Sequence, residues 1–96
     1  MKKTSFSPVC DACANEMDRL TIAKDYDALA SYVLQQEDEY ASNNDFECAP
    51  IFFYIGTGNS TLAHHYHRSS SDNEQEITYR KKALFYFRKA ISLLES

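Results

Sequence analysis

Apolar side chains in the first quarter of the chain recur every three to four residues. Ser7-Pro8 supplies a capping residue followed by a proline, a pair that favours the start of a helix. Cys13, Met17 and Leu20 then fall on one face of a helix. The pattern predicts a first helix over residues 8–23.

A second helix is predicted after the polar pair Lys24-Asp25. From Tyr26 to Tyr40 one face is apolar and the segment becomes acidic toward its end, as in an amphipathic helix. The apolar positions of this face are Tyr26, Leu29, Ala30, Val33 and Leu34. The two helices together predict a helical hairpin over residues 8–41.

The third segment allows two interpretations. Ser42-Asn43-Asn44-Asp45 predicts a loop, and Pro50 suits the first turn of the next element. Ile51–Ile55 could be a buried strand by composition, but the apolar face continues at helical spacing through two glycines. That face consists of Ile51, Ile55, Leu62 and Tyr66. We therefore predict a helix.

The last helix is the best defined by its pattern. The polar stretch from Arg68 to Glu76 lacks an apolar anchor and predicts a mobile connection over 68–76, followed by a helix from Ile77 to Leu94. The second hairpin then spans residues 50–95. We expect one all-α domain over residues 1–96, built from about four helices in antiparallel hairpins.

Two apolar stripes run side by side along this last helix, which predicts a face wide enough to be clamped from two sides. Ala83, Phe87, Ala90 and Leu94 form one stripe, and Leu84, Phe87, Ile91 and Leu94 form the other. A buried Phe87 ring would make Phe87→Ala cost about 3–5 kcal/mol.

Composition and charge narrow the class of protein. With 96 residues and 44% apolar residues, the chain fits one globular domain. The net charge of −4 disfavours nucleic acid as a partner, and the basic residues Arg80-Lys81-Lys82 and Arg88-Lys89 are typical of a solvated helix face. No apolar run is long enough to cross a bilayer, and the three cysteines do not form a disulfide framework. We expect a cytoplasmic protein with no membrane partner.

Cysteine and histidine offer one metal-binding alternative. Cys10-x2-Cys13, Cys48 and the cluster His64-His65-x-His67 could supply the thiolates and imidazoles of a structural zinc site. The cysteine pair also suits a buried helix face, and the histidines suit a helix end, which is the interpretation that we favour. We expect no metal and no other cofactor. No spacing ties a nucleophile to an acid and a base, so we expect no enzyme.

Ala83-x3-Phe87-x2-Ala90 resembles the second helix of a tetratricopeptide repeat (TPR), in which small residues allow close helix approach. Two registers are open for the preceding helix. One places Phe52, Ile55, Gly56 and Asn59 on the motif positions, and the other places Tyr54, Thr57, Gly58 and Thr61 there. The resemblance implies two TPR-like units.

This resemblance implies an adaptor that binds a peptide or partner protein in a groove. In one register Phe53, Thr57 and Ser60 would line the groove; in the other Ile55, Asn59 and Leu62 would line it. Asn59→Ala is expected to weaken partner binding without unfolding the protein. The apolar last helix also suggests a homo-oligomer.

The phrases Phe52-Phe-Tyr-Ile-Gly-Thr-Gly-Asn59 and Lys82-Ala-Leu-Phe-Tyr-Phe-Arg-Lys-Ala-Ile91 also resemble the amino-terminal TPR region of bacterial proteins that end in a HEPN domain and act in defence or toxin systems. The Arg-x4–6-His motif of that domain is absent. This resemblance implies, as an alternative, a regulatory or assembly arm or an inhibitor in such a system.

Overall fold

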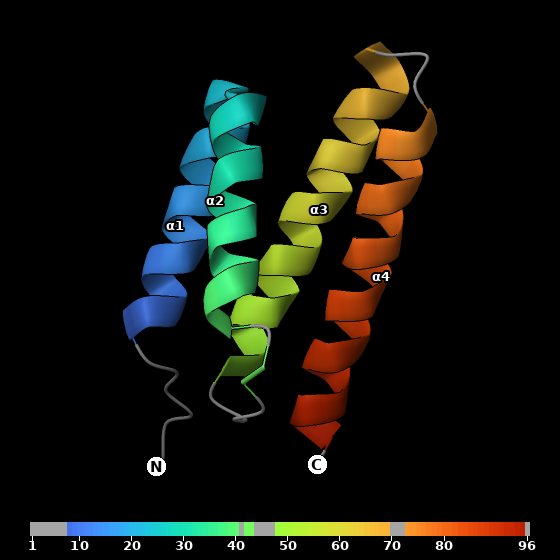
Figure 1. The fold of residues 1–96 in the computed structure, drawn as a ribbon. Coiled ribbons are helices and arrows are strands. Elements are labelled where there is room, and N and C mark those ends of the chain that lie inside the picture. Colours follow the sequence, from blue (N-terminus) through green and yellow to red (C-terminus); the bar gives the residue numbers. More distant parts are fainter. Residues whose placement is uncertain (1–7, 41, 44–47, 70–72, 96) are drawn as a thin grey trace.

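The computed structural model describes residues 8–40, 42–43, 48–69 and 73–95, and in these residues it consists of four α-helices. The helices are α1 (Pro8–Ala23), α2 (Tyr26–Tyr40), α3 (Ala49–Ser69) and α4 (Asn73–Glu95). They run alternately in opposite directions, and α3 lies between the α1–α2 pair and α4 (Figure 1). The predicted all-α fold of antiparallel hairpins is confirmed.

The turn between α1 and α2 is very short because two caps overlap in it. Lys24 has a positive φ of 58°, and its N–H donates to the carbonyl of Thr21 at 3.1 Å. The N–H of Asp25 donates to the carbonyl of Leu20 at 3.1 Å, which completes the left-handed cap that usually carries glycine. The Asp25 carboxylate then accepts from the N–H of Ala28 and caps α2. The predicted bounds of both helices are confirmed.

The predicted mobile connection over 68–76 is wrong where the structure describes it, because α3 extends to Ser69 and α4 begins at Asn73. Polar and aromatic contacts replace the missing apolar anchor. The Glu76 carboxylate accepts from Nε of Arg80 at 2.8 Å and lies 3.1 Å from Nδ1 of His67. The rings of Tyr66 and Tyr79 stack with centroids 5.6 Å apart. The predicted loop after α2 is non-helical at Ser42-Asn43, and Asn44-Asp45 lies outside the described residues.

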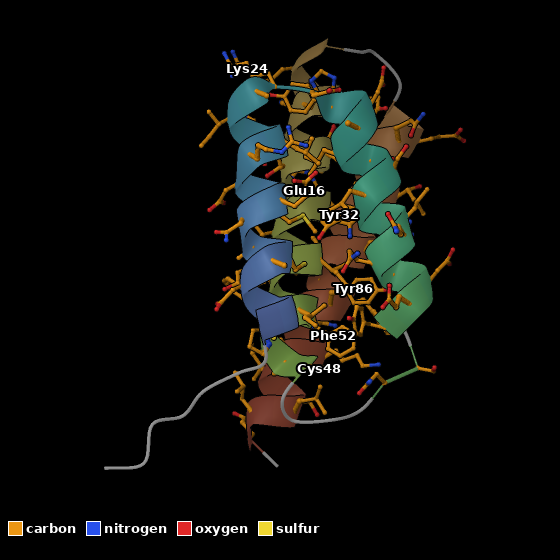
Figure 2. The ribbon with its side chains drawn as sticks, turned by 90° about the vertical axis from the view of Figure 1, so that its left-hand side faces the viewer. Glu16, Lys24, Tyr32, Cys48, Phe52 and Tyr86 are labelled. Atoms are coloured by element: carbon orange, nitrogen blue, oxygen red, sulfur yellow. The ribbon has the colours of Figure 1, made fainter. Side chains whose placement is uncertain are left out.

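The core is built around α3, whose segment 51–55 is helical as predicted. Phe52, Ile55 and Leu62 are fully buried, together with Leu29 and Val33 of α2. Figure 2 shows Phe52 beside Tyr86 of α4, and their rings are stacked with centroids 6.1 Å apart. Apolar burial on both sides of α3 holds the two hairpins in one core.

Two glycines, Gly56 and Gly58, let neighbouring helices approach α3 closely on opposite sides. A Cβ on Gly58 would lie 2.7 Å from Cγ2 of Val33 and 3.0 Å from Sδ of Met17. A Cβ on Gly56 would instead lie 2.8 Å from two ring atoms of Phe87 and 3.2 Å from the carbonyl oxygen of Ala83. Gly58 therefore admits α1 and α2, whereas Gly56 admits α4.

The buried carboxylate of Glu37 in α2 contacts both helices of the second hairpin. Glu37 of α2 accepts a hydrogen bond from Nδ2 of Asn59 in α3 at 3.2 Å, and its other oxygen lies 3.3 Å from Nζ of Lys82 in α4. Asn59 also donates to the carbonyl of Ile55 at 2.9 Å. The acidic end of α2 thus holds three helices together, because a buried charge needs both a counter-charge and hydrogen bonds.

Candidate functional site

α4 presents two apolar faces that differ in their surroundings. Its inner face packs on α3 through Ala83, Tyr86 and Ala90, all of which are buried. Its outer face leaves large aliphatic side chains about half exposed. These are Ile77 (50%), Leu84 (55%), Ile91 (54%) and Leu94 (53%). Among the described residues no helix covers them.

The outer side chains follow the spacing of a helix-packing seam. Ile77, Leu84 and Ile91 are seven residues apart. Phe87 lies three residues after Leu84, and Leu94 lies three residues after Ile91. Arg80 takes the corresponding position in the first repeat. We call Ile77, Leu84, Phe87, Ile91 and Leu94 the outer seam. At 1.5 Å per residue it extends about 26 Å along α4.

The neighbouring surface of α3 extends the outer seam sideways. Phe53 is 52% exposed, and its ring centroid lies 5.5 Å from that of Phe87. Thr57 and Ser60 are also exposed, and the Thr57 hydroxyl donates to the carbonyl of Phe53 at 3.0 Å. A shallow groove of about 210 Å³ lies between the helices, lined by Ser60, Arg80, Ala83, Leu84 and Phe87.

The structure corrects two expectations about this region. Asn59 is fully buried, as are Ile55 and Leu62, so the register that assigned these three residues to a groove is wrong. Asn59→Ala would disturb the core contact with Glu37 rather than a partner surface. Phe87 is only partly buried, because its ring lies over Gly56 at the edge of α4. The cost expected for a fully buried ring therefore does not apply to it.

Positive charge flanks the outer seam on its solvent side. Arg80, Lys81 and Arg88 are exposed. The other two basic residues of α4 turn toward the core: Lys82 pairs with Glu37, and Nζ of Lys89 lies 4.5 Å from the ring centroid of Phe52. These inward contacts break up the basic strip seen in the sequence. Tyr86 is buried and Tyr79 is stacked on Tyr66, so neither aromatic ring stands beside the exposed cations where it could stack on a nucleic-acid base.

The cysteines and histidines lie apart. Cys10 and Cys13 are buried in the first turns of α1, and the histidines occupy the last turns of α3, at the opposite end of the bundle (Figure 1). Burial raises the pKa of the Cys13 thiol, which disfavours the thiolate. His65 stacks on Tyr26 with ring centroids 3.9 Å apart. No three potential metal-binding side chains converge within the described part of the chain.

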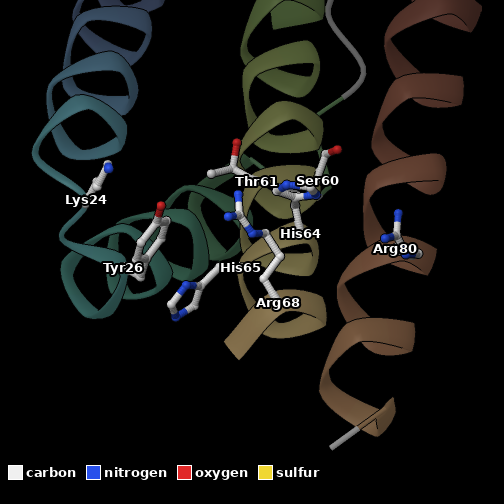
Figure 3. A pocket seen from close by; sticks show the side chains of 8 residues that line it. All are labelled: Lys24, Tyr26, Ser60, Thr61, His64, His65, Arg68 and Arg80. Carbon is white, nitrogen blue, oxygen red and sulfur yellow. The ribbon is translucent and has the colours of Figure 1, made fainter. Parts of the chain in front are cut away.

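A second and larger cavity, of about 580 Å³, lies beside the α1–α2 turn (Figure 3). Lys24 and Tyr26 line it from that turn, five residues line it from α3, and Arg80 lines it from α4. The α3 residues are Ser60, Thr61, His64, His65 and Arg68. Ser60 and Arg80 also line the groove, so the cavity and the groove are neighbours. The sequence analysis singled out the histidines but missed Lys24, Tyr26 and Arg68 as partners in one site.

Comparison with known proteins identified no relative of this chain. No family model, curated protein or solved structure matches the chain. No helix in the described residues is long and apolar enough to span a membrane.

Proposed function

We propose that this chain is a protein–protein interaction module and that its partner is an amphipathic helix with acidic flanks. The outer seam is the observation that carries the proposal. A row of four half-exposed aliphatic side chains and the partly buried Phe87 at heptad spacing is the pattern with which one helix packs on another. Contiguous apolar surface of this kind marks interaction sites in folded proteins.

The chemistry of the partner follows from the charges beside the seam. Lys81 and Arg88 would face the flank of a helix laid along the seam, and Arg80 would meet its first repeat. Carboxylates on that helix would be attracted by these cations, whereas lysines would be repelled. A second copy of α4 is disfavoured for the same reason, because it would bring two sets of cations together. The TPR resemblance supports this proposal at the level of the fold class that it implies.

Phe53, Thr57 and Ser60 are the α3 residues that we assign to the edge of this interface. Their exposure next to the outer seam supports the assignment, and Phe53 supplies an aromatic anchor beside Phe87. Gly56, Ala83 and Ala90 act indirectly, by letting α4 approach α3 so that Phe53 and Phe87 meet at the surface.

Two synthetic helical peptides test the proposal. Both carry leucine at the seam positions over about three heptads, and they differ only in having glutamate or lysine at the flanking positions. Like charges on the flanks keep each peptide from pairing with itself. We expect the glutamate peptide to bind at least about tenfold more tightly than the lysine peptide when titrated by fluorescence anisotropy.

Matched variants separate the outer seam from other apolar surface. Ile91→Asp places a charge in the seam and should abolish binding, whereas Leu34→Asp alters an equally exposed side chain on α2 and should leave it unchanged. Equal affinity for both peptides would contradict the acidic partner. Self-association of the chain in sedimentation experiments, lost in Ile91→Asp, would replace the partner with a second copy.

A further inference from the structure

We propose that the cavity beside the α1–α2 turn binds a phosphorylated small molecule, whose phosphate oxygens are held by Lys24, Arg68 and Arg80. The cavity is a different site from the outer seam, although Arg80 lies beside both. The proposal rests on the presence of cations from three separate parts of the chain in the lining of one cavity, which Figure 3 shows with Lys24 on one side, Arg80 on the other and Arg68 between them. None of the eight described residues that line the cavity is acidic.

The overall charge of the molecule makes this concentration of cations informative. The chain carries a net charge of −4, so an anion is repelled by the molecule as a whole and attracted only where cations are gathered locally. Arg68 has no carboxylate partner among the described residues, and its side chain points back along α3 toward Thr61 (Figure 3). An arginine fork in this position suits the oxygens of a phosphate.

Arg80 is held in place by a carboxylate that lies outside the cavity lining. Glu76 accepts from Nε of Arg80 at 2.8 Å and also contacts His67. The Arg80 and His67 side chains lower the pKa of Glu76, so this carboxylate stays charged at neutral pH. The contact fixes one edge of the guanidinium and leaves its terminal nitrogens, which contact no described carboxylate, for a second anion.

Hydroxyl groups and aromatic rings complete the lining. Ser60, Thr61 and Tyr26 can donate hydrogen bonds to phosphate oxygens, and His64 and His65 line the same cavity. The volume of about 580 Å³ exceeds the space that a single phosphate ion needs and lies in the range of small-molecule sites. The stacked pair of Tyr26 and His65 offers a flat apolar wall to any ring that the ligand carries.

The backbone of Lys24 provides an independent sign of a binding role. Its φ of 58° places a lysine in the left-handed region, at the helix-end position where glycine is preferred. Lys24 also lines the cavity, and a non-glycine residue in this backbone conformation can mark a functional position. A lysine in place of glycine at this turn therefore adds a positive charge to the lining of the cavity.

Isothermal titration with inorganic phosphate, tripolyphosphate and ATP, all without divalent cations, tests the proposal at physiological ionic strength. We expect tripolyphosphate and ATP to bind more tightly than inorganic phosphate, because they reach several cations at once. Equal affinity for tripolyphosphate and ATP would assign recognition to the phosphate chain alone. Tighter binding of ATP would show that the stacked rings of Tyr26 and His65 also contribute to recognition, by contacting the adenine ring.

A pair of charge-matched variants decides whether the cavity is responsible. Arg68→Gln should weaken the affinity for tripolyphosphate by about tenfold or more, whereas Arg88→Gln, which removes the same charge from exposed α4 surface, should change it by less than about twofold. Equal loss in both variants, or no binding of any of the three probes, would overturn the proposal.

Lys24→Gly distinguishes a binding role from a structural one. Glycine adopts the left-handed conformation freely, so the melting temperature should not fall, while the affinity for tripolyphosphate should fall several-fold. A variant that melts at a lower temperature and binds tripolyphosphate unchanged would show that Lys24 serves the turn and not the ligand.

Discussion

The inner and outer faces of α4 use similar side chains in different ways. On the inner face small residues alternate with one large ring, so that Ala83 and Ala90 let the helix approach α3 while Tyr86 fills the space beside Phe52. On the outer face every seam position is large, and none of the five side chains belongs to the buried core. Tight packing needs small residues next to large ones. The all-large outer face therefore suits a partner that brings its own complementary surface.

This difference predicts unequal costs of truncation on the two faces. The largest loss should follow Phe52→Ala, because the ring is fully buried and lies against both Tyr86 and the Lys89 ammonium group. We expect the free energy of unfolding to fall by about 3–5 kcal/mol in urea denaturation. If the free energy of unfolding fell by less than about 1 kcal/mol, the inner face of α4 would not be tightly packed on α3.

Substitutions of the two glycines of α3 test the difference between the buried and the exposed side of the α3–α4 contact, and we expect intermediate losses of stability. Gly58→Ala forces a methyl group against the stiff, buried Val33 and should destabilise the protein by about 1–3 kcal/mol. Gly56→Ala meets the partly exposed Phe87 ring, which can move outward, and the gain in helix propensity of about 1 kcal/mol offsets part of the cost. Thermal unfolding of both variants should therefore rank Gly58→Ala as the less stable. The reverse order would show that the Phe87 ring is held as firmly as the core.

The smallest effect on stability is expected on the outer face. Ile91→Ala removes a side chain that is 54% exposed, so the free energy of unfolding should change by about 0.5 kcal/mol or less. The same substitution should still weaken binding of the glutamate-flanked peptide. A loss of several kcal/mol in the isolated monomer would show that the outer seam is already covered within the fold.

The sequence predicted where most helices lie, but it predicted less well which of their residues are buried. Helical spacing of apolar residues marked α1 and α2 at the bounds that the structure has, because that spacing is a local property. The same local argument failed over 68–76, where a polar stretch is helical because Glu76 pairs with residues one turn away and across the hairpin. Ion pairs of this kind leave no apolar pattern to recognise.

Asn59 and Glu37 show the limit most clearly for the candidate site. An asparagine in a helix and a glutamate in an acidic run are both typical of solvent-exposed positions, yet they are buried against each other. Their pairing joins residues of different hairpins, so no spacing within either helix could indicate it. Phe53, Thr57 and Ser60, in contrast, lie on one exposed stripe that helical periodicity alone places together.

The sequence by itself determined that this protein is all-α, where its first two helices begin and end, and that α4 carries more apolar surface than one neighbour can cover. Each of these depends on residues three or four positions apart. Only the tertiary structure decided which face of α4 lies inside, that Glu37 links three helices, and that Lys24, Arg68 and Arg80 share a cavity. Those arrangements arise when elements distant in the chain pack to bury apolar area, and the packing brings polar residues together across the helices.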